Sequence, residues 1–205
     1  MLKPIPYKII LASNSPRRRE LLAGLGLDFE VHVIKGISEA YPNDLPVEEI
    51  PQFIAREKAS AYEVKPNELV ITADTVVVVD DASCGSVVLG KPHDTNEARH
   101  MLHAISGKTH RVITGVCLTT HNDQRQFGVT TEVTFRKLTD DEIDYYISNY
   151  RPFDKAGAYG IQAAGALLVQ GLTGDYFNVM GLPVAALARH LREMGVTAAL
   201  SEQNE

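Results

Sequence analysis

The sequence predicts an α/β protein built on a mixed β-sheet, because segments with strand periodicity and segments with helix periodicity alternate along the whole chain. Its 205 residues are 44% apolar and 22% charged, which is the composition of an ordinary globular protein. A chain of this length can bury one sizeable core without disulfides or a structural metal. We therefore expect residues 1–205 to form a single domain that ends in a frayed tail over about 197–205.

The first half of the chain is expected to alternate strands with helices. The strands share short runs of apolar and β-branched residues and are expected at 9–12, 29–33 and 69–79. The first helix is capped by Ser15, begins at Pro16 and ends at Gly26. The second helix lies within 47–64, and Pro51 marks its true start because proline is tolerated only in the first turn.

The second half continues the same alternation. The strands are expected at 87–89, 111–120, 128–135 and 167–169, and the helices at 94–105, 139–148 and 183–195. Two of these helices open with a capping box, formed by Asp94 with Glu97 and by Thr139 with Glu142. The polar turn at 81–86 predicts a hairpin between the long apolar strand and the short strand that follows it.

The charge balance and the cysteine usage argue against several function classes. A net charge of −6 disfavours a nucleic-acid polymer as partner, since non-specific binding needs a basic surface. Cys84 and Cys117 form no CxxC pair, so they predict neither a disulfide framework nor a zinc site and suit a reducing cytoplasm. No apolar run approaches the roughly 20 residues of a membrane span. We expect a cytoplasmic protein with no membrane partner, and a homodimer stays open.

Three arginines, Arg17 to Arg19, stand in the first turn of the first expected helix, where positive charge is unfavourable. The free N–H groups and the helix dipole already make this end positive, so acidic residues would be favoured there. A strand, the polar loop Ser13 to Ser15 and a helix start together form an arrangement that binds phosphate, and arginines add bidentate donors. We favour this interpretation over the alternative, a solvated basic turn.

Asp74 and Thr75 break the apolar run at 69–79. A carboxylate inside such a strand must be paired, protonated or bound to a metal, because an uncompensated buried charge is too costly. The alternative is a turn at Asp74 between two strands, but Asp and Thr without Gly or Pro make a poor turn. We therefore favour a functional role for this carboxylate.

Lys58 is expected on the apolar face of its helix, four residues after Ile54. Either its stem passes over the core and its ammonium reaches water, or the charge has a role, and periodicity alone leaves both interpretations open. Glu39 and Lys91 are uninformative by residue type, because acidic loop residues and lysines in turns are usually solvated.

Eight blocks of the sequence, which together span nearly the whole chain, resemble the Maf family of nucleoside triphosphate pyrophosphatases in their order. They are 13–22 (SNSPRRRELL), 36–39 (GISE), 55–59 (AREKA), 72–75 (TADT), 89–92 (LGKP), 106–112 (SGKTHRV), 154–162 (DKAGAYGIQ) and 174–183 (GDYFNVMGLP). The resemblance implies an elongated mixed sheet flanked by helices, with two lobes and the active site in a central cleft, similar to inosine triphosphate pyrophosphatases. It also implies hydrolysis between the α- and β-phosphates to a nucleoside monophosphate and pyrophosphate.

The resemblance also implies roles for individual residues. Ser13, Arg17 and Arg18 would hold the phosphates of the substrate. Lys58 and Lys91 would offset the charge that develops on the bridging oxygen. These roles explain the basic helix start as part of a substrate site.

The implied metal ligands are the two acidic residues Glu39 and Asp74. They would hold Mg²⁺ or Mn²⁺, and Asp74 would also accept a proton from the attacking water. Ser38 stands where the family often has a second acidic residue, which leaves Glu39 as the single acidic ligand of that loop.

Within the family, Thr75 and the ending Tyr159 to Gln162 resemble the subgroup that acts on dTTP and UTP. The amide of Gln162 has a donor and an acceptor and can pair with the imide edge of thymine or uracil. Two other functions stay open. One is a nucleotide-binding regulator of septum formation without catalysis, and the other is a broad nucleotide phosphatase that releases single phosphates.

Overall fold

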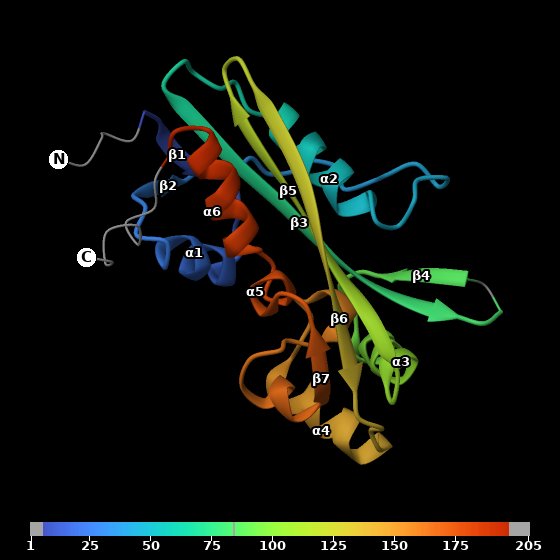
Figure 1. Cartoon of the computed structure of the whole chain (residues 1–205). Coiled ribbons are helices and arrows are strands. Elements are labelled where there is room, and N and C mark those ends of the chain that lie inside the picture. Colours follow the sequence, from blue (N-terminus) through green and yellow to red (C-terminus); the bar gives the residue numbers. More distant parts are fainter. Residues whose placement is uncertain (1–5, 84, 197–205) are drawn as a thin grey trace. The chain divides into compact units, whose positions relative to one another are not determined.

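The computed structural model describes residues 6–83 and 85–196, and it has the expected mixed α/β architecture (Figure 1). The strands are β1 (Lys8–Leu11), β2 (Phe29–Val31), β3 (Glu68–Asp81), β4 (Gly85–Leu89), β5 (Thr109–Thr120), β6 (Gln124–Phe135) and β7 (Val169–Thr173). The helices are α1 (Pro16–Ala23), α2 (Ile50–Ser60), α3 (Thr95–Ile105), α4 (Asp140–Tyr150), α5 (Tyr176–Val179) and α6 (Val184–Glu193). Two short 3₁₀ turns, η1 (Ala156–Ala158) and η2 (Ala163–Leu167), precede β7.

The strands form one seven-stranded sheet in the order β2-β1-β3-β5-β6-β7, and β4 pairs with β3 off this path. β1 runs parallel to both β2 and β3, with Ile9 opposite Phe29 and Leu69. β3 and β4 form the expected antiparallel hairpin, and β6 pairs antiparallel with β7. The predicted fold class, a mixed sheet flanked by helices, is therefore confirmed.

The chain divides into two compact units, each made of segments that lie far apart in the sequence. The first comprises the chain up to Asp74, Thr114–Val129 and the chain from Gly181 onward. The second comprises Thr75–Ile113 and Thr130–Met180. The chain passes between the units within the long strands β3, β5 and β6, and once more between Met180 and Gly181. The expected cleft stays a prediction.

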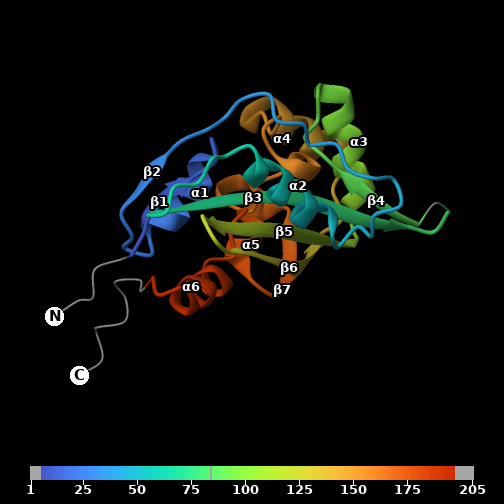
Figure 2. The same cartoon turned by 90° about the horizontal axis from the view of Figure 1, so that it is seen from above.

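In the first unit, helices cover both faces of the sheet. Adjacent residues of a strand point to opposite faces, and the neighbours Phe127 and Gly128 of β6 show this directly. The ring of Phe127 stacks on His190 of α6, with 4.2 Å between ring centroids, whereas Gly128 faces the side chain of Gln52 on α2. α6 and α2 therefore lie on opposite faces, as Figure 2 shows.

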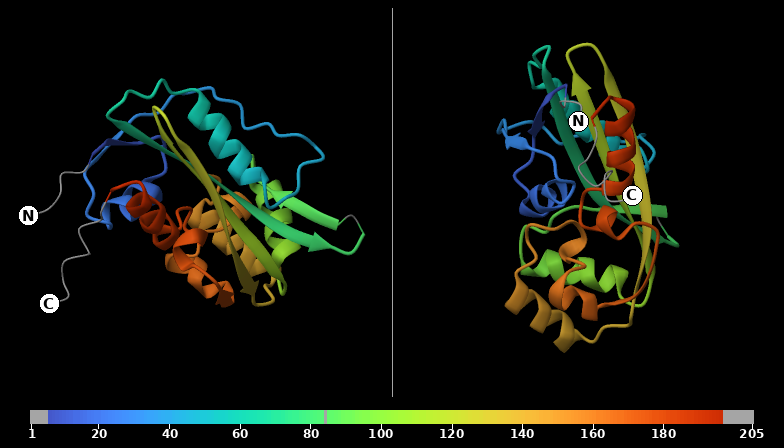
Figure 3. Two further views of the ribbon diagram at one scale, coloured as in Figure 1. Left: turned by 45° about the horizontal axis from the view of Figure 1, so that its top comes forward. Right: turned by 60° about the vertical axis from the view of Figure 1, so that its left-hand side comes forward.

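In the second unit, α3 and α4 lie side by side (Figure 3), and buried apolar residues of both helices share one core with the sheet. The fully buried members of this core include Leu102 and Ile105 of α3, Phe135 of β6 and Ile143 of α4. At about 25 cal/mol per Å² of apolar surface removed from water, such side chains supply the main stabilisation of the unit.

Several boundaries differ from those expected. The strand expected at 167–169 begins only at Val169, because Leu167 ends the turn η2 and is 71% exposed. β5 begins at Thr109 and β6 at Gln124, two and four residues before their expected starts, and the short helix α5 was not expected. Glu97 accepts from the N–H of His93, one residue before the expected partner, whereas the Thr139 box is complete.

Two expectations fall outside the described residues, namely the frayed tail at 197–205 and any role of Cys84. Cys117 is buried and free. Within the described ranges, the longest apolar helices fall short of what crossing a bilayer requires.

Candidate functional site

The start of α1 has the strand, loop and helix arrangement that the sequence predicts. The hydroxyl of Ser15 caps the helix and accepts from the backbone N–H of Arg18 at 3.4 Å. The buried hydroxyl of Ser13 accepts from the backbone N–H of Ser15 at 3.2 Å and from the Arg18 guanidinium at 3.5 Å. Ser13, Arg17 and Arg18 therefore share one loop and helix start, which bears no acidic residue in its first turn.

The guanidinium of Arg18 is held in place by the segment that precedes α6. Its Nε donates to the carbonyl oxygen of Gly181 at 2.7 Å. Burial lowers the pKa of Arg18, and the nearby charge of Asp74 opposes this shift. Arg18 therefore lies close enough to Asp74 for their charges to interact.

Asp74 lies in the middle of β3, which continues unbroken from Glu68 to Asp81. The alternative of a turn at this point is therefore wrong. The six residues before Asp74 and the four after Thr75 are buried, whereas these two are partly exposed. They are the two partly exposed residues within the stretch from Glu68 to Val79, which is otherwise buried.

Lys58, in the last turn of α2, joins two carboxylates. Its Nζ lies 2.8 Å from Oδ1 of Asp74 and 2.7 Å from Oε1 of Glu39. The side chains of Lys58 and Asp74 are only 17% and 14% exposed, whereas that of Glu39 is 53% exposed. The ammonium is paired at the edge of the core, so the interpretation that it merely reaches water is wrong.

The carboxylates of Glu39 and Asp74 suit a hard divalent cation, because both supply oxygen donors and both already approach one positive charge. In the part of the chain that the structure describes, no group of three or more His, Cys, Asp or Glu residues gathers as a ready metal site. A cation held by these two carboxylates would complete its shell with water and substrate phosphates, which is common for Mg²⁺.

The other three predicted site residues belong to the second unit. Thr75 follows Asp74 along β3 and is partly exposed. Lys91 is exposed just after β4, and Gln162 is exposed at the start of η2, where its side chain makes no capping hydrogen bond. The two units thus divide the predicted residues: Ser13, Arg17, Arg18, Glu39, Lys58 and Asp74 in the first, and Thr75, Lys91 and Gln162 in the second.

Comparison with known proteins decides the family. The family described as "Maf-like protein" matches residues 8–194. The chain belongs to the Maf family. The resemblance inferred from the eight sequence blocks is therefore confirmed.

Curated relatives of this Maf chain carry the name "dTTP/UTP pyrophosphatase". One from Phocaeicola vulgatus is 59% identical over 92% of this chain and 96% of its own length. One from Bacteroides fragilis is 51% identical with the same coverage, and one from Porphyromonas gingivalis is 49% identical over 92% of this chain and 95% of its own. The solved structure of the Staphylococcus aureus Ham1 protein aligns with a TM-score of 0.44 at 15% identity, covering 62% of this chain and 71% of that one.

Two residues that position α2 in this Maf protein were missed by sequence reasoning. The buried hydroxyl of Thr72 donates to the carbonyl oxygen of Ala55 at 2.7 Å, so β3 holds the helix three residues before Lys58. A Cβ atom on Gly115 of β5 would lie 2.2 Å from the backbone nitrogen of Gln52, so helix and strand touch through their backbones. A polar Thr and a Gly inside apolar strands are the signals that could have identified them.

A buried pair in the second unit of the Maf chain was also missed. His110 is 1% exposed, and its Nε2 lies 2.8 Å from the hydroxyl of Tyr159. The rings of Phe135 and Tyr159 contact the imidazole edge to face. In the sequence His110 stands between Thr109 and Arg111, one residue before the strand expected at 111–120, so no apolar pattern there marks it as buried.

We expect His110 to make stability fall in acid. Burial lowers its pKa to about 4, whereas an unfolded chain leaves histidine near 6.5. Between these values the unfolded chain binds more protons, so the free energy of unfolding falls as pH drops from about 6.5 to 4, by at most about 3 kcal/mol, and is unaffected above. Urea unfolding at pH 7, 5.5 and 4.5 measures this loss.

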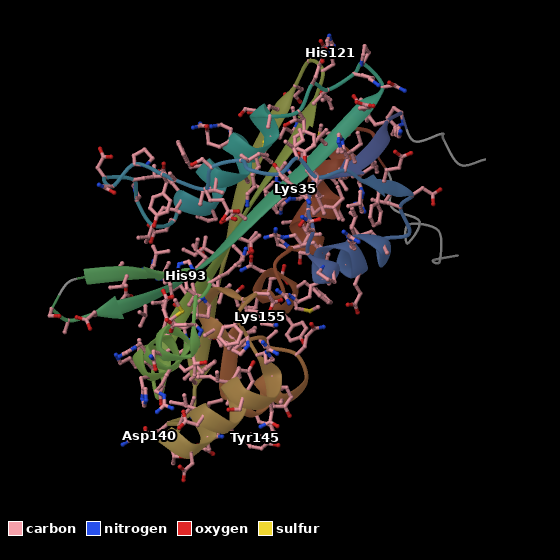
Figure 4. The ribbon with its side chains drawn as sticks, turned by 180° about the vertical axis from the view of Figure 1, so that it is seen from behind. Lys35, His93, His121, Asp140, Tyr145 and Lys155 are labelled. Carbon is pink, nitrogen blue, oxygen red and sulfur yellow. The ribbon has the colours of Figure 1, made fainter. Side chains whose placement is uncertain are left out.

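The matched variants are His110→Gln, which should reduce the pH dependence, and His121→Gln, which should keep it. His121 is exposed in the turn between β5 and β6 (Figure 4). Equal pH slopes in the wild type and His110→Gln would show that carboxylates alone cause the acid loss.

Proposed function

We propose that this Maf protein hydrolyses nucleoside triphosphates, with dTTP and UTP as preferred substrates, to the nucleoside monophosphate and pyrophosphate. The observation that carries the proposal is the bridge of Lys58 between Asp74 and Glu39. Arg18, at the basic start of α1, is near enough to Asp74 to feel its charge. An anionic triphosphate needs cations, and an attacking water needs a nearby carboxylate as base. The names of the relatives agree with this chemistry.

The phosphates would be bound by Ser13, Arg17 and Arg18, through hydroxyl, guanidinium and the free N–H groups of the helix start. Lys58 would offset the charge that develops on the oxygen between the α- and β-phosphorus atoms, and we assign the same role to Lys91 on the second unit. Arg18 is held by the Gly181 carbonyl and Lys58 by its two carboxylates before the substrate arrives, so these two groups need little reorganisation during reaction.

Asp74 would accept the proton of the attacking water, and the hydrogen bond from Lys58 holds the carboxylate in a fixed orientation. Glu39 and Asp74 would together hold Mg²⁺ or Mn²⁺. When bound, such an ion supplies positive charge to the phosphate oxygens and can lower the pKa of a water molecule.

Product analysis tests the proposal directly. The protein is incubated with a panel of canonical and modified nucleotides, with Mg²⁺, with Mn²⁺ and with a chelator. We expect pyrophosphate and a nucleoside monophosphate, formed only with a metal. Orthophosphate as the primary product would indicate a broad phosphatase, and nucleotide binding without any product would indicate a non-catalytic regulator.

We further propose that the enzyme acts on free nucleotides in the cytoplasm, where these substrates are made and used, and not on nucleic-acid polymers. The net charge of −6 supports this choice, because polymer binding relies on a basic surface. A homodimer is compatible with the proposal, and the molar mass in solution decides that point.

We expect Arg17→Ala to weaken substrate binding, raising KM for UTP roughly tenfold or more, which is typical for loss of a charge-assisted hydrogen bond. Arg19→Ala is the matched control, because it removes the same charge from the same helix turn at an exposed position. Tm should not fall in either variant, since each relieves excess positive charge at a helix N-terminus. Equal effects of both substitutions on KM would mean that only bulk charge matters.

We expect UTP and dTTP to be hydrolysed well ahead of CTP and the purine triphosphates. The amide of Gln162 can pair with O4 and N3–H of uracil, whereas cytosine presents an amino group in place of O4 and leaves two donors facing each other. Gln162→Glu removes the donor and should lose much of the preference. Competition between UTP and CTP in one vessel measures the ratio of kcat/KM, and an unchanged ratio in this variant would assign base recognition to other groups.

A further inference from the structure

The loop that carries Gln162, between α4 and β7, has an unusual backbone. Gly157 has a φ of +68°, and the next residue, Ala158, has a φ of +59° although it is not a glycine. Ala158 is fully buried. An alanine in this region costs free energy and persists only where the surroundings leave the chain no other path.

Three hydrogen bonds hold this loop from outside. The N–H of Gly157 donates to the carbonyl oxygen of Gly90 at 3.0 Å, which joins the loop to the turn before Lys91. The hydroxyl of Tyr159 bonds with Nε2 of His110, and the N–H of Gly160 donates to the hydroxyl of Tyr146 at 3.1 Å. The rings of both tyrosines are buried, so two phenol oxygens fix the loop within the core.

The backbone segments before and after Gln162 also contact each other directly. A Cβ atom on Gly165 would lie only 1.5 Å from the carbonyl oxygen of Gly160, and the N–H of Gly165 donates to the carbonyl oxygen of Gln162 at 3.1 Å. The side chain of Lys155, labelled in Figure 4, lies against Gly160. The Gln162 backbone is therefore held on both sides, while its side chain is exposed.

The buried pair of His110 and Tyr159 is less stabilising than an apolar pair would be at the same place. Nδ1 of His110 is buried and, within the described residues, lacks a hydrogen-bond partner. Two apolar rings in place of the His110 and Tyr159 pair would avoid this penalty. Unpaired buried polar atoms and strained backbone of this kind are found mostly at functional sites.

We propose that the hydroxyls of Tyr159 and Tyr146 are positioning groups for base selection, because they fix the loop that presents the Gln162 amide. The inference rests on the proposed function, in which Gln162 reads the base. A glutamine amide that turns by 180° exchanges its donor for its acceptor, and it can then pair with cytosine as well as with uracil. Selectivity for uracil and thymine therefore needs an amide of fixed orientation, and a fixed backbone is the first requirement for that.

The test uses Tyr159→Phe and Tyr146→Phe, which remove one oxygen each and keep the ring. Tyr145→Phe is the matched control, because Tyr145 lies on the same helix as Tyr146 and is 63% exposed (Figure 4). We measure the UTP-to-CTP ratio of kcat/KM by competition, kcat for UTP alone, and Tm. The ratio of the dissociation constants of UTP and CTP is measured as well, and it is called the binding ratio below.

We expect both test variants to lose at least tenfold of the UTP preference in kcat/KM and in binding, while kcat for UTP changes less than about threefold. Tyr145→Phe should behave as the wild type. A lower Tm with an unchanged ratio in both test variants would overturn the inference and assign the tyrosines a structural role only. A wild type without any preference for UTP over CTP would also overturn it.

Failure of the proposed function gives a different result. If the wild type releases no pyrophosphate from any nucleotide, the catalytic proposal is wrong, and the binding ratio still decides whether the tyrosines orient Gln162. A binding ratio that falls in Tyr159→Phe and Tyr146→Phe supports the inference even then, and an unchanged one overturns it.

Discussion

Asp74→Asn should lower kcat for dTTP and UTP by about 10²- to 10⁴-fold, the range typical for loss of a general base. The amide keeps the shape of the carboxylate but cannot accept a proton at neutral pH. It also removes one of the two negative charges that face the ammonium of Lys58. KM should change less than kcat, because the phosphate contacts at the start of α1 stay intact.

Asp28→Asn is the matched control for this substitution. Asp28 is an exposed carboxylate of the same unit, in the loop between α1 and β2, and its loss should leave kcat unchanged. A near wild-type kcat in Asp74→Asn would remove Asp74 from the chemistry. A lower Tm with full specific activity would show that the carboxylate only pairs with Lys58.

Gly115→Ala should destabilise the protein at or above the upper end of the roughly 1–3 kcal/mol that overpacking usually costs. The new methyl group would lie 2.2 Å from the nitrogen of Gln52 and 2.3 Å from the carbonyl carbon of Pro51, and backbone atoms cannot rotate away as a side chain can. The first turn of α2 must therefore move off β5. Because α2 also carries Lys58, we expect lower kcat as well as a lower free energy of unfolding.

Gly171→Ala controls for the loss of a strand glycine, since a Cβ atom there meets nothing within 4 Å. Urea unfolding gives the stability of both variants, and specific activity of the folded fraction gives the effect on Lys58. If Gly115→Ala unfolds like the wild type, the close contact between α2 and β5 is not a constraint on the fold.

Local signals in the sequence were sufficient for the starts of the longer helices. Ser15 and Thr139 cap their helices as expected, and α2 begins next to Pro51, because capping and proline geometry depend on residues within one turn. The predicted start of β7 was wrong by two residues. The limits of an edge strand are set by its pairing with the neighbouring strand, and here that neighbour, β6, lies far away in the sequence. The helix α5 spans four residues, too few for a periodic pattern.

The sequence by itself determined that Asp74 is exceptional, because a charge inside an apolar strand is visible without knowing any partner. It left Lys58 undecided, since periodicity shows which face a residue occupies but not what lies opposite. Only the tertiary structure brought both Asp74 and Glu39 within hydrogen-bond distance of that ammonium, and only it brought the Gly181 carbonyl to Arg18 from 163 positions away. Contacts between distant segments depend on how helices pack on the sheet, and backbone approaches such as that of Gly115 to Gln52 set that packing.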